Sequence, residues 1–297
     1  RRSSDLFRAV QCFIGLNAGN LNKTTEDLFM SSRPRIAKFH TVSIIFPAFL
    51  IVLLPGCASL RQDTSAQPIA SLQAVDILDT THAATSPVSR IDPNNPGNWW
   101  ENRHNELNGR TAKGNYDLVF IGDSITQGWE GSGKTVWEEF YGDRKALNLG
   151  ISGDRTEHVL WRFENGNIDG LSPKLAVIMI GTNNFMANTA QEIGDGIITI
   201  VQRLNAELPA TNILIVGIFP RFEKPHPKRE MLAEASRIAS TVADGKRIHY
   251  IDIGEAFLDD DGTLPKNIMP DFLHPNERGY QIWAEAIEPQ VKRLLSK

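Results

Sequence analysis

The sequence contains only two cysteines, Cys12 and Cys57, and both lie in its N-terminal part. No disulfide framework can therefore stabilise the rest of the chain, which depends on a packed hydrophobic core. Basic residues are also scarce beyond residue 57, where 24 Lys and Arg stand against 32 Asp and Glu. Because no basic excess remains to bind a phosphate backbone, we expect no nucleic-acid partner.

Long apolar runs are missing as well. The longest, Thr41–Pro55, has about 15 residues, whereas a membrane-spanning helix takes about 20. It ends in Leu54–Cys57 (LPGC), which resembles a bacterial lipobox and implies cleavage before Cys57 and lipidation of its thiol. An uncleaved anchor, plain secretion and a buried core helix are the alternatives. Basic side chains precede the run, as in a secretory signal: Arg33, Arg35 and Lys38.

Composition divides the chain into three parts. Residues 1–57 form an N-terminal extension and signal peptide; Met30 stands where such a signal would begin, which makes residues 1–29 candidate untranslated sequence. Residues 58–98 are rich in Ser, Thr, Ala, Gln, Asp and Pro, which is typical of a flexible linker. Residues 99–297 form the folded domain. We therefore expect an exported lipoprotein, periplasmic or at the cell surface, that meets the membrane only through its lipid anchor.

The domain is predicted to begin with a short amphipathic helix that consists of Trp99, Trp100 and the polar run Glu101–Lys113 and packs onto the domain. After it, short apolar runs alternate with stretches of helical pattern, which indicates parallel strands covered on both faces. The sequence thus predicts an α/β fold, a three-layer α/β/α sandwich with a five-stranded parallel sheet. The expected strands are Leu118–Ile121, Ala146–Leu149, Leu175–Ile180, Ile213–Ile218 and Ile248–Ile253, and the expected helices are Thr135–Tyr141, Glu157–Glu164, Ala190–Leu208, Arg229–Ala243 and Glu277–Leu295.

Polar and glycine-rich segments follow the first three apolar runs, and another precedes the last helix. Ligands of such sheets bind at the carboxyl ends of the strands, so chemistry is expected there. Together the segments supply a hydroxyl nucleophile, close backbone N–H groups, an amide donor and an imidazole near a carboxylate, which acyl transfer needs. They are Gly122–Thr126 (GDSIT), Gly150–Asp154 (GISGD), Gly181–Asn184 (GTNN) and Asp271–Pro275 (DFLHP).

These blocks, in this order, resemble those of the SGNH (GDSL-like) hydrolase family from Tyr116 to Leu295. Within it, IGDSITQ, ALNLGISGDRTEHVLWRFENG, GTNN, FPRFEKPHP and DFLHP are most similar to the catalytic subunits of platelet-activating-factor acetylhydrolase. The resemblance implies a flavodoxin-like fold, with Ser124 as nucleophile and Asp271 and His274 completing a triad. It also implies an oxyanion hole made by Gly153 and Asn183, to which Ser124 adds its own N–H.

Each of these residues also has a plain structural interpretation. Ser124 could begin a helix, Asn183 could close a turn, and His274 could be a surface histidine. A carboxylate three residues earlier does not distinguish His274, because three other histidines also have one: His82, His104 and His226. What distinguishes His274 is its place between the last strand and the last helix. Asp123 and Asp154 are predicted to be structural, through backbone hydrogen bonds in tight turns.

Two further motifs are interpreted as decoys. Gly128–Thr135 (GWEGSGKT) matches the P-loop pattern, but Ser124–Gln127 separate it from the strand that would aim its N–H groups at a phosphate. We predict a loop beside the site and no nucleotide. Asp259–Gly262 (DDDG) lacks the spacing of a calcium loop and is predicted to be a turn. The sequence indicates no cofactor and no metal.

The leading hypothesis is a serine carboxylic-ester hydrolase that deacetylates a small or carbohydrate ester. The loops expected to border the site, 126–134 and 221–226, are short and polar, and large apolar surfaces come only from Trp129, Phe185 and Phe222. The alternatives are a lysophospholipase or thioesterase on the same machinery, and a non-catalytic surface binding protein. The expected partner is a small-molecule ester, and a homodimer is compatible with these features.

Overall fold

The structure, a computed structural model, describes residues 81–296. The predicted signal peptide, the lipidation of Cys57 and the first part of the predicted linker lie outside the described residues and stay predictions. Within the part of the chain that the structure describes, no helix has the length and apolar character needed to cross a bilayer.

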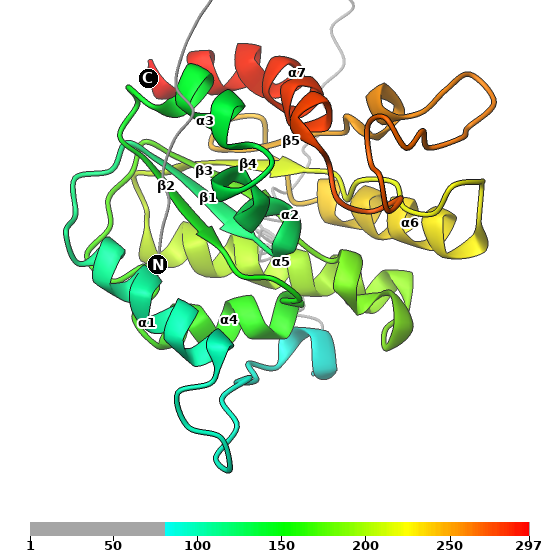
Figure 1. Ribbon diagram of the computed structural model, residues 1–297. Helices are drawn as coiled ribbons and strands as arrows, with labels where there is room; N and C mark the ends of the chain where they lie inside the picture. The colour runs from blue at the N-terminus through cyan, green and yellow to red at the C-terminus, as the bar shows by residue number, and fades with distance from the viewer. Residues whose placement is uncertain (1–80, 297) are drawn as a thin grey trace, which may run out of the picture. The chain divides into compact units, whose positions relative to one another are not determined.

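Five parallel strands form a single sheet in the order β2-β1-β3-β4-β5 (Figure 1). In β1, Gly122 lies opposite Gly150 of β2 and Met179 of β3, so the three strands end at the same level. Every residue of β1 and β3 is buried, which explains why both read as continuous apolar runs. The predicted sheet is confirmed; its strands are β1 Leu118–Gly122, β2 Ala146–Gly150, β3 Leu175–Met179, β4 Asn212–Val216 and β5 Ile248–Ile251.

Helices cover both faces of the sheet, which confirms the three-layer prediction (Figure 1). Alternate residues of β1 serve the two cores: Val119 and Ile121 pack with one set of helices, and Leu118 and Phe120 with the other. The first set is α1 Trp99–Thr111, α4 Thr156–Glu164, α5 Ala190–Glu207 and α6 Pro227–Ser240; the second is α2 Ser124–Gln127, α3 Lys134–Tyr141 and α7 Glu277–Leu295. Short 3-10 helices occur at η1 Ala83–Thr85, η2 Gly128–Glu130, η3 Thr182–Met186 and η4 Gly254–Phe257.

Side chains at the helix starts explain where several helices begin. Asn98 caps α1 by accepting hydrogen bonds from the N–H groups of Trp100 and Glu101. Thr189 and Glu192 form a capping box at the start of α5. Asn276 accepts from Gly279 N–H at the start of α7, which fixes where the loop that carries His274 ends.

Residues 81–98, which their composition predicts as part of a linker, differ from that expectation because they pack on the domain. Ala84 is fully buried, and its carbonyl accepts a hydrogen bond from Thr156 Oγ1 (2.8 Å). Val88 N–H donates to the carbonyl of Glu157 (3.1 Å). Apart from η1, these residues form no helix or strand, as their polar composition predicts, but composition does not reveal hydrogen bonds to distant residues. The helix predicted next is α1, in which Trp100 is buried.

Candidate active site

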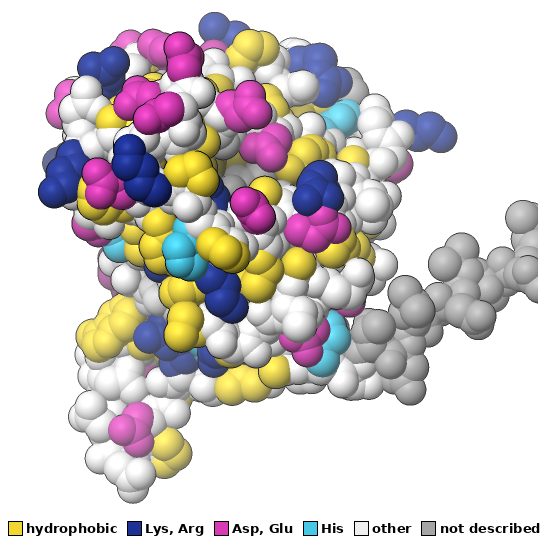
Figure 2. Space-filling model, turned by 90° about the vertical axis from the view of Figure 1, so that its right-hand side faces the viewer, with side chains coloured by type: hydrophobic (Ala, Val, Ile, Leu, Met, Phe, Trp, Pro, Cys, Tyr) yellow, Lys and Arg dark blue, Asp and Glu magenta, His cyan; other side chains and the backbone are white. Residues whose placement is uncertain are grey.

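The polar segments predicted to carry chemistry meet at the carboxyl ends of three neighbouring strands. Ser124 follows β1, Gly153 follows β2 and Asn183 lies in η3 after β3. The loop that leads into α7 brings Asp271 and His274 to the same edge. This loop lies at the right-hand side of Figure 1, the side that faces the viewer in Figure 2, where hydrophobic, basic, acidic and histidine side chains are interspersed.

Ser124 is the first residue of α2. The preceding Asp123 caps this short helix, because its carboxylate accepts from Ile125 N–H (2.9 Å). Tyr280 of α7 donates its hydroxyl to the Ile125 carbonyl (2.7 Å), which ties α2 to the last helix. In this setting Ser124 Oγ lies 2.9 Å from His274 Nε2.

His274 is oriented by Asp271. Its Nδ1 lies 2.6 Å from Asp271 Oδ2, and its backbone N–H donates to Asp271 Oδ1 (2.7 Å), as does Leu273 N–H (3.1 Å). Burial alone would raise the pKa of Asp271, but the hydrogen bonds from His274 outweigh it and hold that pKa below its ordinary value. An ionised Asp271 favours the proton on Nδ1, which leaves the Nε2 lone pair facing Ser124 Oγ.

Two backbone N–H groups at this edge, those of Ser124 and Gly153, donate to no group within residues 81–296. Gly153 has a φ of 75°, a conformation that glycine adopts at no steric cost. Asn183 Nδ2 donates to the Asp154 carbonyl (2.9 Å) and lies 3.4 Å from Asp123 Oδ2. Other N–H groups of the Gly153 loop are paired: Ile151 with Gly122, Ser152 with Gln127 and Asp154 with Ile151.

Comparison with known proteins identifies the family of this chain. Residues 120–282 match the GDSL-like Lipase/Acylhydrolase family, and the human platelet-activating factor acetylhydrolase IB subunit alpha1 is 34% identical over 215 residues, 72% of this chain and 91% of that protein. The chain belongs to the GDSL-like lipase/acylhydrolase family. The rat alpha2 subunit is also 34% identical, over 67% of this chain and 86% of its own. The family resemblance that the sequence motifs imply is confirmed.

Solved structures share the fold of this GDSL-like protein. A putative platelet activating factor from Streptococcus pneumonia matches with a TM-score of 0.54 and 20% identity over 65% of this chain and 95% of its own. A putative acylhydrolase from Bacteroides fragilis matches with a TM-score of 0.55 and 19% identity over 64% of this chain and 96% of its own. Membership of an acylhydrolase family makes ester hydrolysis the general chemistry expected of this protein.

Asp123 and Asp154 lie behind the strand ends of this acylhydrolase and are fully buried. Burial raises the pKa of Asp123 to about 7, against the lowering effect of its hydrogen bond from Ile125 N–H. The interpretation of Asp154 needs correction, because its carboxylate binds side chains instead of the backbone of a tight turn. Trp100 Nε1 donates to Asp154 Oδ1 (2.7 Å), and Arg162 Nε forms an ion pair with Oδ2 (2.9 Å).

Sequence reasoning missed Arg162, which is fully buried in α4. Besides Asp154 it reaches the ends of two strands, because its Nη1 donates to the Leu149 carbonyl (2.7 Å) and its Nη2 to the Gly122 carbonyl (3.3 Å). The signal was present in the sequence, since Arg162 lies next to Phe163 on a helix whose neighbouring positions are apolar. A charged residue on such a face needs buried partners.

Arg221 borders the site and was predicted only as part of a polar loop. Its guanidinium lies 3.8 Å from the ring centroid of Phe185 and 4.9 Å from that of Phe222, and its Nη1 donates to the Thr182 carbonyl (3.1 Å). Phe222 N–H donates to the carbonyl of Phe272 in the loop of Asp271 (2.9 Å). Arg221 thus covers the faces of both rings beside the predicted site.

Trp129, expected at the border of the site, belongs to the core instead. It is 1% exposed, and its ring centroid lies 4.5 Å from that of Tyr280 and 4.9 Å from that of Trp283. It lies in the segment with the P-loop pattern, where Gly131 and Gly133 donate their N–H groups to the Gly128 carbonyl. Those N–H groups are therefore not directed at a ligand.

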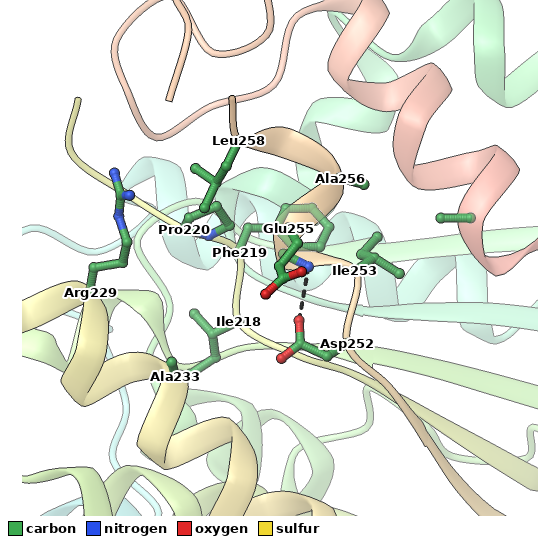
Figure 3. Close-up of a pocket in the computed structure, with 12 residues that line it drawn as sticks. Ile218, Phe219, Pro220, Arg229, Ala233, Asp252, Ile253, Glu255, Ala256 and Leu258 are labelled. Carbon is green, nitrogen blue, oxygen red and sulfur yellow. Dashed lines mark hydrogen bonds between the residues drawn. The ribbon is translucent and has the colours of Figure 1, made fainter. Parts of the chain in front are cut away.

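A cavity of about 560 Å³ lies at the carboxyl ends of β4 and β5, between α6 and the segment after β5 (Figure 3). Its lining is largely apolar, and Asp252 in its wall accepts a hydrogen bond from Gly254 N–H (2.8 Å). Ser124, Asp271 and His274 are not among the lining residues. Between residues 81 and 296, no group of three or more His, Cys, Asp and Glu side chains is placed to hold a metal ion.

Proposed function

We propose that this protein is a serine esterase in which Ser124 is the nucleophile, His274 the general base and Asp271 the residue that orients it. The observation that carries the proposal is the continuous hydrogen-bonded line from Ser124 Oγ through the imidazole to Asp271, with distances of 2.9 Å and 2.6 Å. A neutral imidazole with Nδ1 bound to a carboxylate can accept the serine proton at Nε2.

In the proposed reaction, Ser124 Oγ attacks the ester carbonyl while its proton passes to His274 Nε2. The N–H groups of Ser124 and Gly153 and the Asn183 side chain bind the oxyanion that forms. Collapse of the tetrahedral intermediate breaks the bond to the alcohol oxygen, which leaves with the proton from His274. Water then attacks the acyl-serine by the same steps in reverse and releases the acid.

A serine-reactive fluorophosphonate probe tests this proposal. The purified protein should be labelled covalently, and substitution Ser124→Ala should abolish labelling. Ser152→Ala is the matched control, because Ser152 lies in the loop beside Gly153 and should leave labelling intact. Labelling that persists in Ser124→Ala would assign the reactive hydroxyl elsewhere, and an unlabelled wild-type protein would favour the non-catalytic binding protein.

We further propose that the acyl group is small, as in an acetate ester of a sugar or another polar alcohol. The named relatives are acetylhydrolases. The apolar surfaces beside the site also disfavour long chains, because Trp129 is in the core and Arg221 covers Phe185 and Phe222. A buried methylene contributes about 0.8 kcal/mol only where a dry wall receives it.

A series of p-nitrophenyl esters from acetyl to decanoyl tests acyl length. The value of kcat/KM should be highest for the acetyl ester, and acetylated sugars should be deacetylated. A steady rise toward the decanoyl ester would favour a lysophospholipase or thioesterase instead.

We also propose export and lipid anchoring through Cys57, with residues 58–80 as a tether. This part of the chain lies outside the described residues, so the proposal is supported by the LPGC motif alone. Expression in a bacterium with radiolabelled palmitate should label the protein, and Cys57→Ala should prevent it. Equal labelling of both forms would contradict the anchor.

A further inference from the structure

Side chains from other parts of the chain hold the end of β2 and the loop after it. Carbonyl groups of residues 149–154 accept hydrogen bonds from four side chains that are far apart in sequence, whereas Gly153 N–H donates to no described group. The pairs are Arg162 Nη1 with the Leu149 carbonyl (2.7 Å), Arg103 Nε with that of Gly150 (3.4 Å), Arg90 Nη1 with that of Ser152 (2.8 Å) and Asn183 Nδ2 with that of Asp154 (2.9 Å).

Arg90 differs from the other donors because it belongs to residues 81–98, which precede the α/β fold. Its Nη1 also lies 3.3 Å from Asp154 Oδ1, and its guanidinium lies 5.3 Å from the ring centroid of Trp99. A Cβ placed on Gly153 would be 3.1 Å and 3.3 Å from its two terminal nitrogens. The guanidinium therefore lies directly against Gly153, with a side chain that is 28% exposed.

The carbonyl that Arg90 holds and the N–H proposed for the oxyanion belong to one peptide group. Ser152 supplies its C=O and Gly153 its N–H. Because a trans peptide is planar, its C=O and N–H point in opposite directions, and fixing one fixes the other. A donor on the carbonyl oxygen also polarises the peptide and strengthens its N–H as a donor.

We propose that Arg90 is a positioning residue for the oxyanion hole, which holds the Ser152–Gly153 peptide so that Gly153 N–H faces the developing oxyanion. This inference rests on the esterase function proposed above. Electrostatic stabilisation of a transition state requires donors that are in place before charge develops. The segment before the fold thereby contributes to catalysis without contacting the substrate.

Steady-state kinetics on p-nitrophenyl acetate test the inference in the full chain. Arg90→Ala should lower kcat by about tenfold, less than the ~10²–10³ typical of losing an oxyanion donor, because the N–H remains but is less fixed. The KM should stay within about twofold of wild type, because the ground-state ester carries no full charge. Millimolar guanidinium chloride should restore part of kcat in Arg90→Ala and not raise that of the wild type.

Two further variants separate positioning from general packing. Trp99→Ala removes the aromatic partner of Arg90 and leaves its bonds to Ser152 and Asp154, so kcat should be unchanged. Arg90→Lys keeps one donor and should lie between Arg90→Ala and wild type; it replaces Arg90→Ala if that variant does not fold. Three results would overturn the role of Arg90. They are a kcat of Arg90→Ala within twofold of wild type, a change in KM alone, and a lower kcat that accompanies a lower Tm and is not rescued by guanidinium.

Failure of the inference and failure of the proposed function give different results. A wild-type protein that neither reacts with fluorophosphonate nor hydrolyses the ester contradicts the esterase function itself, and with it the role of Arg90. An active wild type, an inactive Ser124→Ala and an unimpaired Arg90→Ala contradict only the role of Arg90.

Discussion

The two sides of the candidate site are built in different ways. On the nucleophile side, Asp123, Asp154 and Arg162 are fully buried and connect residues that are distant in sequence. On the base side, the side chains of Asp271 and His274 are 56% and 43% exposed, and within residues 81–296 the Asp271 carboxylate binds only groups within three positions of itself. The difference indicates that the proposed oxyanion donors are fixed by the whole domain, whereas the proposed acid-base pair is a local motif.

The largest effect on activity is expected from substitutions of the three residues proposed to carry out the reaction. Ser124→Ala, His274→Ala and Asp271→Asn should each lower kcat/KM for an acetate ester by about 10⁴-fold or more. The Tm of His274→Ala and Asp271→Asn should change little, because both side chains are substantially exposed. If any of the three variants kept an activity within tenfold of wild type, its residue would have no role in the mechanism. A large fall in the Tm of His274→Ala or Asp271→Asn would contradict our view that the base side is a local motif.

The nucleophile side should be far more sensitive in stability. Arg162→Met removes the fully buried ion-pair partner of the Asp154 carboxylate, which then keeps only the partly exposed Arg90, and we expect the free energy of unfolding to fall by about 3–5 kcal/mol. Urea denaturation measures this change. The double variant Arg162→Met, Asp154→Asn should recover part of the loss, since it removes a buried charge that has lost its main partner. A loss no larger than that of Asp271→Asn would show that burial does not distinguish the two sides.

Asn183→Ala should lower kcat by about 10²–10³-fold, the usual effect of removing one oxyanion donor. The control is Asn212→Ala. Asn212 is the first residue of β4, at the edge of the sheet opposite to the site, and its side-chain amide donates to the carbonyls of Lys174 and Leu294. Its loss should affect stability and leave kcat unchanged. Equal kcat values for the two variants would exclude Asn183 from the oxyanion hole.

The two sides should also respond oppositely to pH. Burial raises the pKa of Asp123 from 3.8 to about 7, so the folded protein keeps a proton that the unfolded chain loses, and the free energy of unfolding falls as pH rises from about 4 to 7. The pKa of Asp271 is lowered, so its contribution is present above its ordinary pKa and is lost as pH falls through the folded value.

Thermal denaturation at pH 5 and pH 8 tests the sign for Asp123, and a series extended below about pH 4 tests the sign for Asp271. The Tm of Asp123→Asn relative to wild type should be higher at pH 8 than at pH 5. Asp271→Asn should be only slightly less stable than wild type at pH 8, and the difference should vanish in strong acid. A Tm difference for Asp123→Asn that is the same at both pH values would mean that Asp123 titrates normally.

The smallest effect on activity is expected for Lys134, which belongs to neither side of the candidate site. Lys134 is exposed at the start of α3, where its Nζ lies 3.9 Å from Glu138 Oε1. Lys134→Ala should leave kcat/KM within about twofold of wild type, because a surface ion pair contributes little. ATP with magnesium should not shift the Tm; micromolar binding abolished by the substitution would contradict our interpretation of the P-loop pattern.

The sequence predicted what depends on local periodicity and order along the chain. Apolar runs gave the strands, and the blocks after them gave Ser124, Gly153 and Asn183. The pair Asp271 and His274 was found because it lies between the last strand and the last helix; its spacing of three positions alone did not distinguish it. Arg90 and Arg162 were not found, because their partners are fixed only by the tertiary fold: Arg90 and Ser152 are 62 positions apart. Composition likewise could not show that residues 81–98 pack on the domain and are not a free linker. It also could not show that Trp129 is buried in the core and does not border the site.

The last helix has a consequence for the order in which the protein matures during synthesis. Helix α7 supplies Trp283, Ile287 and Val291 to the core on one face of the sheet, and its Tyr280 holds α2 at Ser124. A nascent chain that has not yet released α7 from the ribosome therefore has only α2 and α3, of the helices described above, to cover this face of the sheet, and its Ser124 lacks the support that Tyr280 gives to α2. We therefore expect this domain to complete its folding only after α7 emerges, and a chain stalled before residue 277 to be incompletely packed and prone to aggregate.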